Sequence, residues 1–370
     1  MKHVRNFLAS LLVALVVAAG LMFEASAAVR PLRQPQQQPA ASAAAAATSS
    51  SAPQSDTARG LALYKQGKHK EAIAVLRAVV KQTPADDAAW HSLGQALHGA
   101  GDKGDAVKAY EKAVKLRPDN VLYRTSWALA LITAGKTANA RKEAEAALKL
   151  DARNSVAHYI IGLASLASAS FDEAAREADA VIKLEPNFAA AHLLKGDALI
   201  DSFAQKYAAL PSDGKSARTT LYPLLDQAAQ SIENYLRLNP NDAEAELRRA
   251  QVAALRAFTG TQTDPARPVY REEDTDTPVR ITDYALPTGI ARTISSGRVM
   301  MLVTLDADGT VKSVVPLRAS DPRLVRPYRE AMHKMKFVAA QKGGRAVSQI
   351  RLMDLSFGTF VELRQVTVRP

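Results

Sequence analysis

The sequence predicts an α-solenoid of about five paired-helix repeats with a capping helix, followed by a small α+β domain whose elements run in the order ββαβ. Two observations support the solenoid. A turn position recurs at a constant interval, at Pro84, Pro118, Ala152 and Pro186, and the apolar residues between these positions keep helical spacing. A third observation supports the second domain: from about Arg280 the apolar runs become short and β-branched, which is typical of strands.

Small residues recur in the same register. Each first helix carries a small residue where it would approach its partner helix, at Gly60, Gly94, Ala128, Gly162 and Gly196. The turn between the paired helices carries Gly67, Gly101, Gly135 and, in the fourth unit, Ala169. Glycine adopts the left-handed conformation that ends a helix at little steric cost. One such unit cannot bury its apolar face alone, so we expect stacked units to share a continuous core.

The repeated pattern resembles the tetratricopeptide repeat (TPR) family over residues 56–258, and its interval matches that family's period. The predicted repeats are 56–86, 87–120, 121–154, 155–188 and 189–242. An insertion at 202–221 interrupts the fifth repeat, and it is either a tolerated loop or a flap over the binding groove. The amphipathic segment Ala243–Phe258 is predicted to cap the last apolar face.

Residues 1–27 have the pattern of a secretory signal peptide. A basic start precedes the apolar run Phe7–Phe23, and Ala25-Ser26-Ala27 offers a cleavage site. We expect cleavage after Ala27 and a periplasmic location; an uncleaved inner-membrane anchor facing the periplasm is the alternative. Residues 28–55, rich in Pro, Gln, Ala and Ser, are predicted to form a disordered tether, because they lack the apolar periodicity that builds a core.

A polar linker is predicted at 259–279, before the second domain at 280–370. The linker carries the acidic run Glu272-Glu273-Asp274, which either pairs with the basic domain that follows or is solvated. In the domain the expected elements are strands at 298–305, 310–317 and 347–357, a helix at 321–337, and a further strand at 359–368.

This second domain resembles the C-terminal domain of the TonB energy-transducer family over residues 280–357. The matching positions are Pro287, Ala291, Gly297-Arg298-Val299, Asp308-Gly309-Thr310-Val311, Ser320, Leu324, Ala331, Phe337, Ala340, Gly344 and Val347. The resemblance implies a domain that contacts the periplasmic side of outer-membrane transporters by adding a strand to a sheet edge.

The sequence offers no catalytic constellation. It has no Cys, which excludes thiol catalysis, disulfides and thiolate metal sites. None of its seven His residues forms an H-E-x-x-H pair, and phosphate-loop, dinucleotide and nucleophile-elbow motifs are missing. We therefore predict a protein that is not an enzyme and that binds no cofactor or metal.

Candidate binding residues follow from the TPR resemblance, in which first helices line a concave groove. The corresponding positions are His91, Gln95, His98, Leu129, Ile132, Tyr159, Leu163, Leu166 and Asp197. The apolar middle of this set suggests an apolar helix or strand as the ligand, and the chain's own C-terminal domain is one candidate. The alternative is that these side chains are buried between neighbouring helices.

A second candidate surface is the basic face of the C-terminal helix, at Arg323, Arg326 and Arg329. The chain has a net charge of +11, and residues 297–370 supply +7 of it, from 13 basic and 6 acidic side chains. Such a face attracts anionic partners or is simply solvated. Because the chain is expected to be exported, nucleic acid is not an expected partner.

Together these patterns predict a non-enzymatic cell-envelope adaptor whose partners are proteins or peptides, with an outer-membrane or other envelope component among the candidates. The alternative is a diverged TonB-type energy transducer that keeps its membrane anchor and acts on outer-membrane transport.

Overall fold

The computed structural model describes residues 53–210, 219–260, 268–283, 287, 294 and 296–358. The chain divides into two compact units at Ala152 and Arg153, and each is described by itself. The predicted signal peptide, most of the predicted tether and the predicted strand at 359–368 lie outside the described residues. The tether prediction extends slightly too far, since the first helix begins at Pro53.

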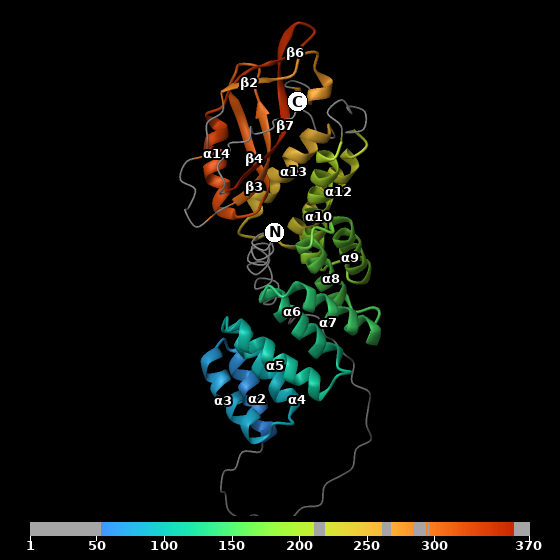
Figure 1. Ribbon diagram of the computed structural model, residues 1–370, viewed down its shortest axis with the longest axis vertical. Helices are drawn as coiled ribbons and strands as arrows, with labels where there is room; N and C mark the ends of the chain where they lie inside the picture. The colour runs from blue at the N-terminus through green and yellow to red at the C-terminus, as the bar shows by residue number, and fades with distance from the viewer. Residues whose placement is uncertain are drawn as a thin grey trace, which may run out of the picture. The chain divides into compact units, whose positions relative to one another are not determined.

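The described residues of the first unit form three helix pairs (Figure 1). They are α2 (Pro53–Lys65) with α3 (His69–Gln82), α4 (Asp87–Gly99) with α5 (Lys103–Leu116), and α6 (Val121–Thr133) with α7 (Thr137–Leu150). The repeat register is visible in the helix starts at Asp87 and Val121. The side chains of Asp86 and Asn120 accept hydrogen bonds from the Ala89 and Tyr123 amides, so each of these first helices begins at an N-cap residue.

The small residues of the register mark close helix contacts. In the second repeat, a Cβ placed on Gly94 would lie 2.7 Å from ring carbons of Tyr110, whose side chain is buried. Ala128 occupies the same slot of the third repeat and is fully buried. The paired helices therefore approach more closely at this slot than a larger side chain would permit, as the sequence predicts.

The turns between paired helices take the predicted left-handed conformation. The φ angles of Gly67, Gly101 and Gly135 lie between 73° and 86°, and Ala169 has a φ of 60°. Ala169 is the only non-glycine residue with positive φ among the described residues. The turn at Ala152 forms without the proline of the other repeats. The fourth unit thus keeps the turn geometry with a side chain that disfavours it.

Replacing Ala169 with glycine should stabilise the protein. The Cβ of alanine costs about 1–2 kcal/mol in the left-handed region, whereas glycine loses less than that in extra chain entropy. We expect Ala169→Gly to raise the free energy of unfolding by about 1 kcal/mol, measured by urea denaturation followed by circular dichroism. Gly101→Ala is the matched reverse change and should lower it by a similar amount; an Ala169→Gly variant less stable than the parent chain would contradict this account.

Over the residues that the structure describes, the second unit begins with five helices. They are α8 (Ser155–Ala167), α9 (Phe171–Leu184), α10 (Ala189–Ala208), α12 (Tyr222–Leu238) and α13 (Ala245–Thr259). The cap is present, but the insertion is shorter than predicted: α10 continues through Ala208, and Ser202 and Phe203 are fully buried. The apolar periodicity of the fifth first helix therefore extends beyond the residue where the sequence suggested an interruption. Residues 211–218 of the insertion lie outside the described part of the chain.

A five-stranded sheet completes the second unit. Its strands run β1 (Val269–Tyr270), β7 (Arg345–Gly358), β3 (Ser296–Leu305) and β4 (Val311–Ala319), with β6 (Ala340–Lys342) also paired to β7. Strand β2 (Arg280–Asp283) pairs with β5 (Lys336–Val338) in a separate two-stranded sheet. The helix α14 (Val325–His333) follows a 3-10 turn at Pro322–Leu324 and covers one face of the strands (Figure 1).

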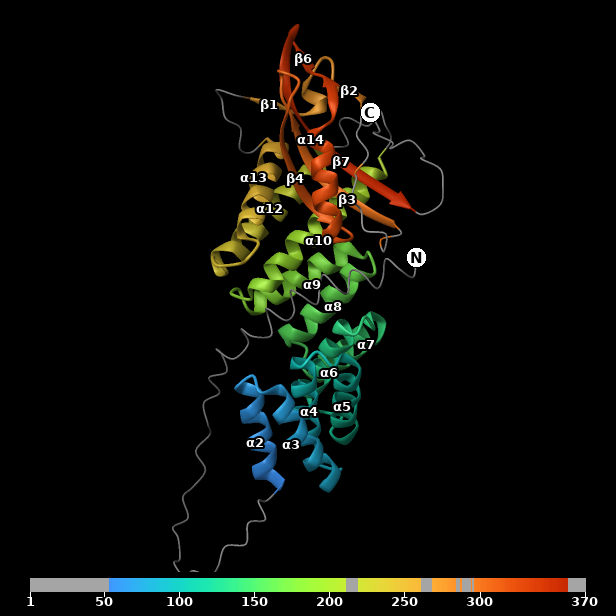
Figure 2. The same cartoon turned by 90° about the vertical axis from the view of Figure 1, so that its left-hand side faces the viewer.

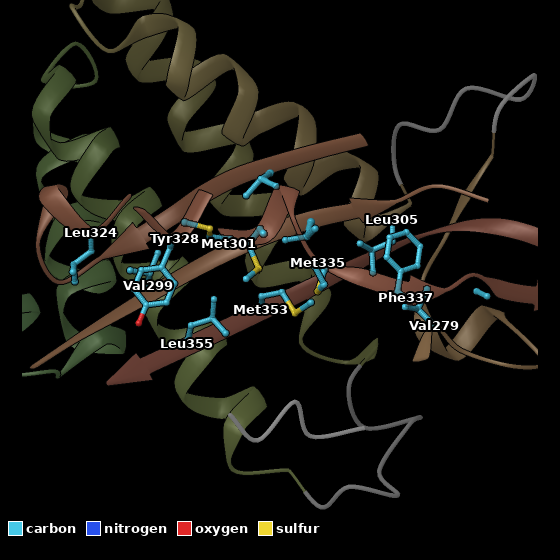
Figure 3. Packing of buried hydrophobic residues seen from close by; sticks show 14 residues of the cluster. Val279, Val299, Met301, Leu305, Leu324, Tyr328, Met335, Phe337, Met353 and Leu355 are labelled. Carbon is cyan, nitrogen blue, oxygen red and sulfur yellow. The ribbon is translucent and has the colours of Figure 1, made fainter. Parts of the chain in front are cut away.

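The core between α14 and the sheet contains the predicted inward positions. Leu324, Tyr328, Met332 and Met335 are buried with alternate residues of β3, such as Met301. Figure 3 shows Tyr328, Met301 and Met335 lying side by side along the strands, among the other side chains of this core. The helix is nevertheless shorter than predicted, because it ends at His333 and Phe337 lies in β5. The apolar pattern continues with helical spacing past His333, although the helix has ended, because the next strand also points apolar side chains into the core.

The opposite face of the sheet is covered by helices of the solenoid. Every residue of β3 from Val299 to Leu305 is buried, which requires cover on both faces and explains why the run is apolar except at Thr304. Figures 1 and 2 show α14 on one side of the strands and α13 on the other. The last repeats and the strand-rich domain therefore share one packed body, whereas the sequence predicted a domain separated by a linker.

Candidate partner-binding surface

The groove positions of the first unit fall into two groups. His91 is 7% exposed, its Nε2 lies 3.0 Å from Ser126 Oγ, and its ring stacks on Tyr123 with centroids 4.6 Å apart. Ile132 is 1% exposed. Gln95, His98 and Leu129 are half-buried. For His91 and Ile132 the structure favours the packing alternative, whereas the other three side chains are partly exposed.

Burial lowers the pKa of His91 from 6.5 to about 4, and the nearby Asp87 opposes this only partly. The unfolded chain therefore binds a proton at a higher pH than the folded one. His91 should contribute stability that is complete above pH 6.5 and is lost as the pH falls towards 4. From these two pKa values we expect a relative loss of about 2 kcal/mol between pH 8 and pH 5.

The control for this prediction is His91→Gln. Both tryptophans, Trp90 and Trp127, lie in the first unit, so their fluorescence reports its unfolding. Urea denaturation at pH 8 and pH 5 should give a smaller pH-dependent loss for the variant than for the parent chain. Equal losses for the two proteins would show that His91 is not the titrating group.

The groove positions of α8 are buried. Tyr159, Leu163 and Leu166 are 5%, 2% and 5% exposed, and the Tyr159 ring packs against Phe188 with centroids 5.1 Å apart. Burial raises the pKa of the Tyr159 hydroxyl above its ordinary value. For these three residues too, the structure supports the packing alternative, so they have no free surface to offer a partner.

The groove position Asp197, on α10, lies in an ionic cluster with the sheet domain. Arg318 on β4 places its Nη1 2.9 Å from Asp197 Oδ2. The same guanidinium donates from Nε and Nη2 to the carboxylate of Asp201, one turn further along α10, at 2.9–3.2 Å. All three side chains are mostly buried, with exposures of 13–16%. Burial alone would lower the pKa of Arg318, but Asp197 and Asp201 outweigh it and raise that pKa above its ordinary value.

A second polar contact joins α13 to the same strand. The buried Gln251 side chain donates to the carbonyls of Pro316 and Leu317, at 2.8 and 3.3 Å. Nearby, Arg248 of α13 lies 3.9 Å from Asp197 Oδ1. The hydrogen bonds from Gln251 hold the backbone of β4 against the capping helix α13. The Arg318 side chain of β4 contacts α10.

The predicted linker forms a third tie between the two parts of this unit. Glu273 accepts a hydrogen bond from the Tyr222 hydroxyl of α12, and Arg271 lies over the same ring, 5.0 Å from its centroid. Glu272 pairs with Arg351 of β7 at 3.1 Å. Of the two alternatives for the acidic run, the structure supports pairing. Residues 268–279 are therefore an ordered connection, and only 261–267 of the predicted linker lie outside the described residues.

Arg318, Asp201 and Gln251 are residues that the sequence analysis missed. Asp197 and Asp201 are spaced i, i+4, which places both carboxylates on one face of α10. That spacing was a usable signal. The sequence could not identify Arg318 as the cation that pairs with these carboxylates. Arg318 lies 117 positions from Asp201, and only the fold brings the two residues together.

The candidate basic face is exposed but partly neutralised. Arg323 lies 2.6 Å from Asp321, and Arg326 lies 2.8 Å from Glu330 on α14. These neighbours raise the pKa of each guanidinium. Arg329 is also exposed. Solvent-exposed ion pairs of this kind contribute little to folding stability. The positive side chains of this face stay at the surface, and the neighbouring carboxylates compensate part of their charge.

Within the described residues, no group of three or more His, Cys, Asp or Glu side chains is placed to hold a metal ion. No helix in the same part of the chain has the length and apolar character needed to span a bilayer.

The fold and this surface define a repeat scaffold of paired helices. A family model described as Tetratricopeptide repeat matches residues 57–121, 125–178 and 162–202. This match supports the tetratricopeptide repeats that the sequence predicts in this part of the chain. No curated protein matches the sequence.

The chain is similar to solved structures over about half of its length. PilW, described as a widely conserved type IV pilus biogenesis factor, is 15% identical, with 56% of this chain and 87% of PilW covered and a TM-score of 0.45. YrrB, a TPR protein with an unusual peptide-binding site, is 15% identical over 53% of this chain and 90% of its own, with a TM-score of 0.40. MamA from Desulfovibrio magneticus RS-1 is 18% identical over 52% and 97%, with a TM-score of 0.41.

Proposed function

We propose that this protein is a non-enzymatic adaptor that binds a protein or peptide partner on its repeat helices. The observation that carries the proposal is the set of tetratricopeptide repeats at 57–202. Gln95 and Leu129 occupy the same slot of successive repeats, and both are half-buried. A half-buried row on successive helices is a surface that a peptide can cover without unfolding the repeats.

The test is photo-crosslinking in cells. A photoreactive amino acid at Gln95 or Leu129 should capture a discrete partner. The same amino acid at Lys112, an exposed position on α5, is the matched control and should give at most a fraction of that yield. Equal capture at Lys112 would overturn the assignment of the partner to the first helices.

We further propose that the adaptor acts in the periplasm, on the basis of the basic start, the apolar run Phe7–Phe23 and the Ala25-Ser26-Ala27 site. Protein recovered from the cell envelope should begin at Ala28, as read by N-terminal sequencing. Recovery of the uncleaved chain in the inner-membrane fraction would instead support the anchored alternative, a diverged TonB-type energy transducer.

The same proposal gives the strand-rich domain the role of a second contact site, on the strength of its sequence resemblance to the TonB C-terminal domain. An outer-membrane or other envelope component is the partner class this resemblance favours. In the adaptor model the domain binds such a component without transmitting energy, and cleavage at Ala27 would leave it no membrane anchor.

A further inference from the structure

In the fifth repeat, one groove position is already occupied by a side chain of the same protein. Asp197 occupies the slot of the repeat register that Gln95, Leu129 and Leu163 occupy in the second, third and fourth repeats. In the fifth repeat this slot is filled from within the chain, because the Arg318 guanidinium of β4 contacts it at 2.9 Å.

The arrangement has the chemistry of a guanidinium site. Asp201 receives Arg318 through two donor nitrogens, the fork geometry that arginine offers and lysine does not. The backbone of β4 is held as well, because Gln251 donates to two successive carbonyls beside Arg318. α10 and α13 therefore bind both the side chain and the main chain of one strand segment.

The site also contains polar atoms that the strand does not satisfy. Asp197 is 9% exposed, and its Oδ1 has no hydrogen-bond donor among the described residues. The Nε of the buried Arg248 likewise has no acceptor there. A buried polar atom without a hydrogen bond costs free energy, and the cation beside Asp197 Oδ1 is Arg248, at 3.9 Å. β4 therefore uses this site without satisfying all of its hydrogen-bonding atoms.

We propose that β4 is an intramolecular ligand of the fifth repeat, and that a partner segment presenting an arginine can bind Asp197 and Asp201 only when the strand-rich domain leaves α10. This inference rests on the proposed function, since it assumes that the repeats bind peptide segments. It adds the chemistry of the partner, an arginine-bearing segment, and its regulation, competition with the chain's own β4.

The experiment opens the contact in the full-length chain. Arg318→Glu places a third carboxylate beside Asp197 and Asp201, so repulsion should separate β4 from α10. Arg326→Glu, an equal change of charge on the exposed face of α14, is the matched control. Because the chain has no Cys, Gln251→Cys introduced into each protein reports opening through its rate of maleimide labelling. We expect labelling at least about tenfold faster with Arg318→Glu than with Arg326→Glu.

The binding measurement uses a fluorescent peptide with the sequence of Val311–Ala319 and a second peptide in which its arginine is replaced by glutamine. The arginine peptide should bind the Arg318→Glu chain at least about tenfold more tightly than the parent chain, and the glutamine peptide should lose this gain. Adding Asp197→Asn and Asp201→Asn should abolish it. Equal affinity for open and parent chains, or equal binding of both peptides, would overturn the proposal.

Folding of the variants is checked by circular dichroism. If Arg318→Glu fails to fold, Arg318→Gln removes the cation without adding charge and is put through the same two measurements. Failure of this inference can be distinguished from failure of the proposed function. The peptide-binding measurement tests α10 in the second unit, whereas crosslinking at Gln95 tests the first unit. Capture at Gln95 without peptide binding to the opened chain would reject the intramolecular ligand and leave the adaptor in place.

Discussion

Arg318→Leu should lower the free energy of unfolding of the second unit by about 3 kcal/mol. The variant leaves the carboxylates of Asp197 and Asp201 mostly buried with their principal cation gone. Removing one partner of a buried ion pair costs more than the pair contributes, because the remaining charge has lost both water and counter-ion.

Urea denaturation followed by circular dichroism measures this loss. The fluorescence of Trp90 and Trp127 follows the first unit and serves as an internal reference. Arg326→Leu, which removes an exposed arginine, should change stability by less than about 0.5 kcal/mol. Replacing Asp197, Asp201 and Arg318 together by leucine should restore most of the loss, since a well-packed apolar cluster can substitute for a buried ion pair.

The pH dependence of Arg318→Leu gives an independent check. Burial raises the pKa of the Asp201 carboxyl even with Arg318 beside it. Without the arginine, the folded-state pKa of Asp201 should exceed the unfolded one by more. A group with a raised folded-state pKa contributes stability that is present at low pH and lost as the pH rises through that value. Arg318→Leu should therefore be closer to the parent chain in stability at pH 5 than at pH 8, and a deficit that grows on acidification would contradict the mechanism.

Gly94→Val should lower the free energy of unfolding of the first unit by about 3 kcal/mol, near the upper end of what overpacking usually costs. A Cβ at this position would already lie 2.7 Å from the Tyr110 ring, and valine adds two methyl groups beyond it. The ring is buried and packed against His91, with centroids 5.4 Å apart, so it has little room to move away. The helices must separate instead, and apolar contacts along their seam are lost.

Gly104→Val is the matched control, in the same repeat. A Cβ at Gly104 meets no heavy atom within 4 Å, and the residue is exposed on α5. Because valine and glycine differ little in helix propensity, this change should stay within about 0.5 kcal/mol. Tryptophan fluorescence during urea denaturation measures the free energy of unfolding of the first unit in both variants. Equal losses for the two would show that helix propensity, and not the approach of Tyr110, limits the size of the residue at position 94.

The repeat register could be predicted from sequence because its causes are local. The turn glycines and the buried alanine at position 128 are each required by the conformation or spacing of neighbouring residues, so their constant interval can be read directly. The predicted inward positions of α14, such as Tyr328 and Met332, are buried for the same reason. The predicted boundary was wrong at Phe337, where the periodicity of the helix passes into β5, and at Ser202, where α10 continues.

The candidate site was predictable only in part. The repeat register identified Asp197 as a groove position, and the structure places it on α10 as expected. The same register could not separate Gln95 and Leu129, which are half-buried, from Tyr159 and Leu163, which are buried. That distinction depends on the size and placement of side chains from neighbouring helices.

The sequence by itself determined the solenoid, its turns and the α+β character of the C-terminal part, because helix spacing, turn chemistry and strand patterning act over a few residues. Only the tertiary structure decided that the last repeats and the sheet form one body and that the acidic run of the linker is paired. It also decided that Asp197 faces Arg318 and not solvent. These outcomes depend on which apolar faces meet across long sequence separations. Patterns that span only a few residues do not specify those contacts.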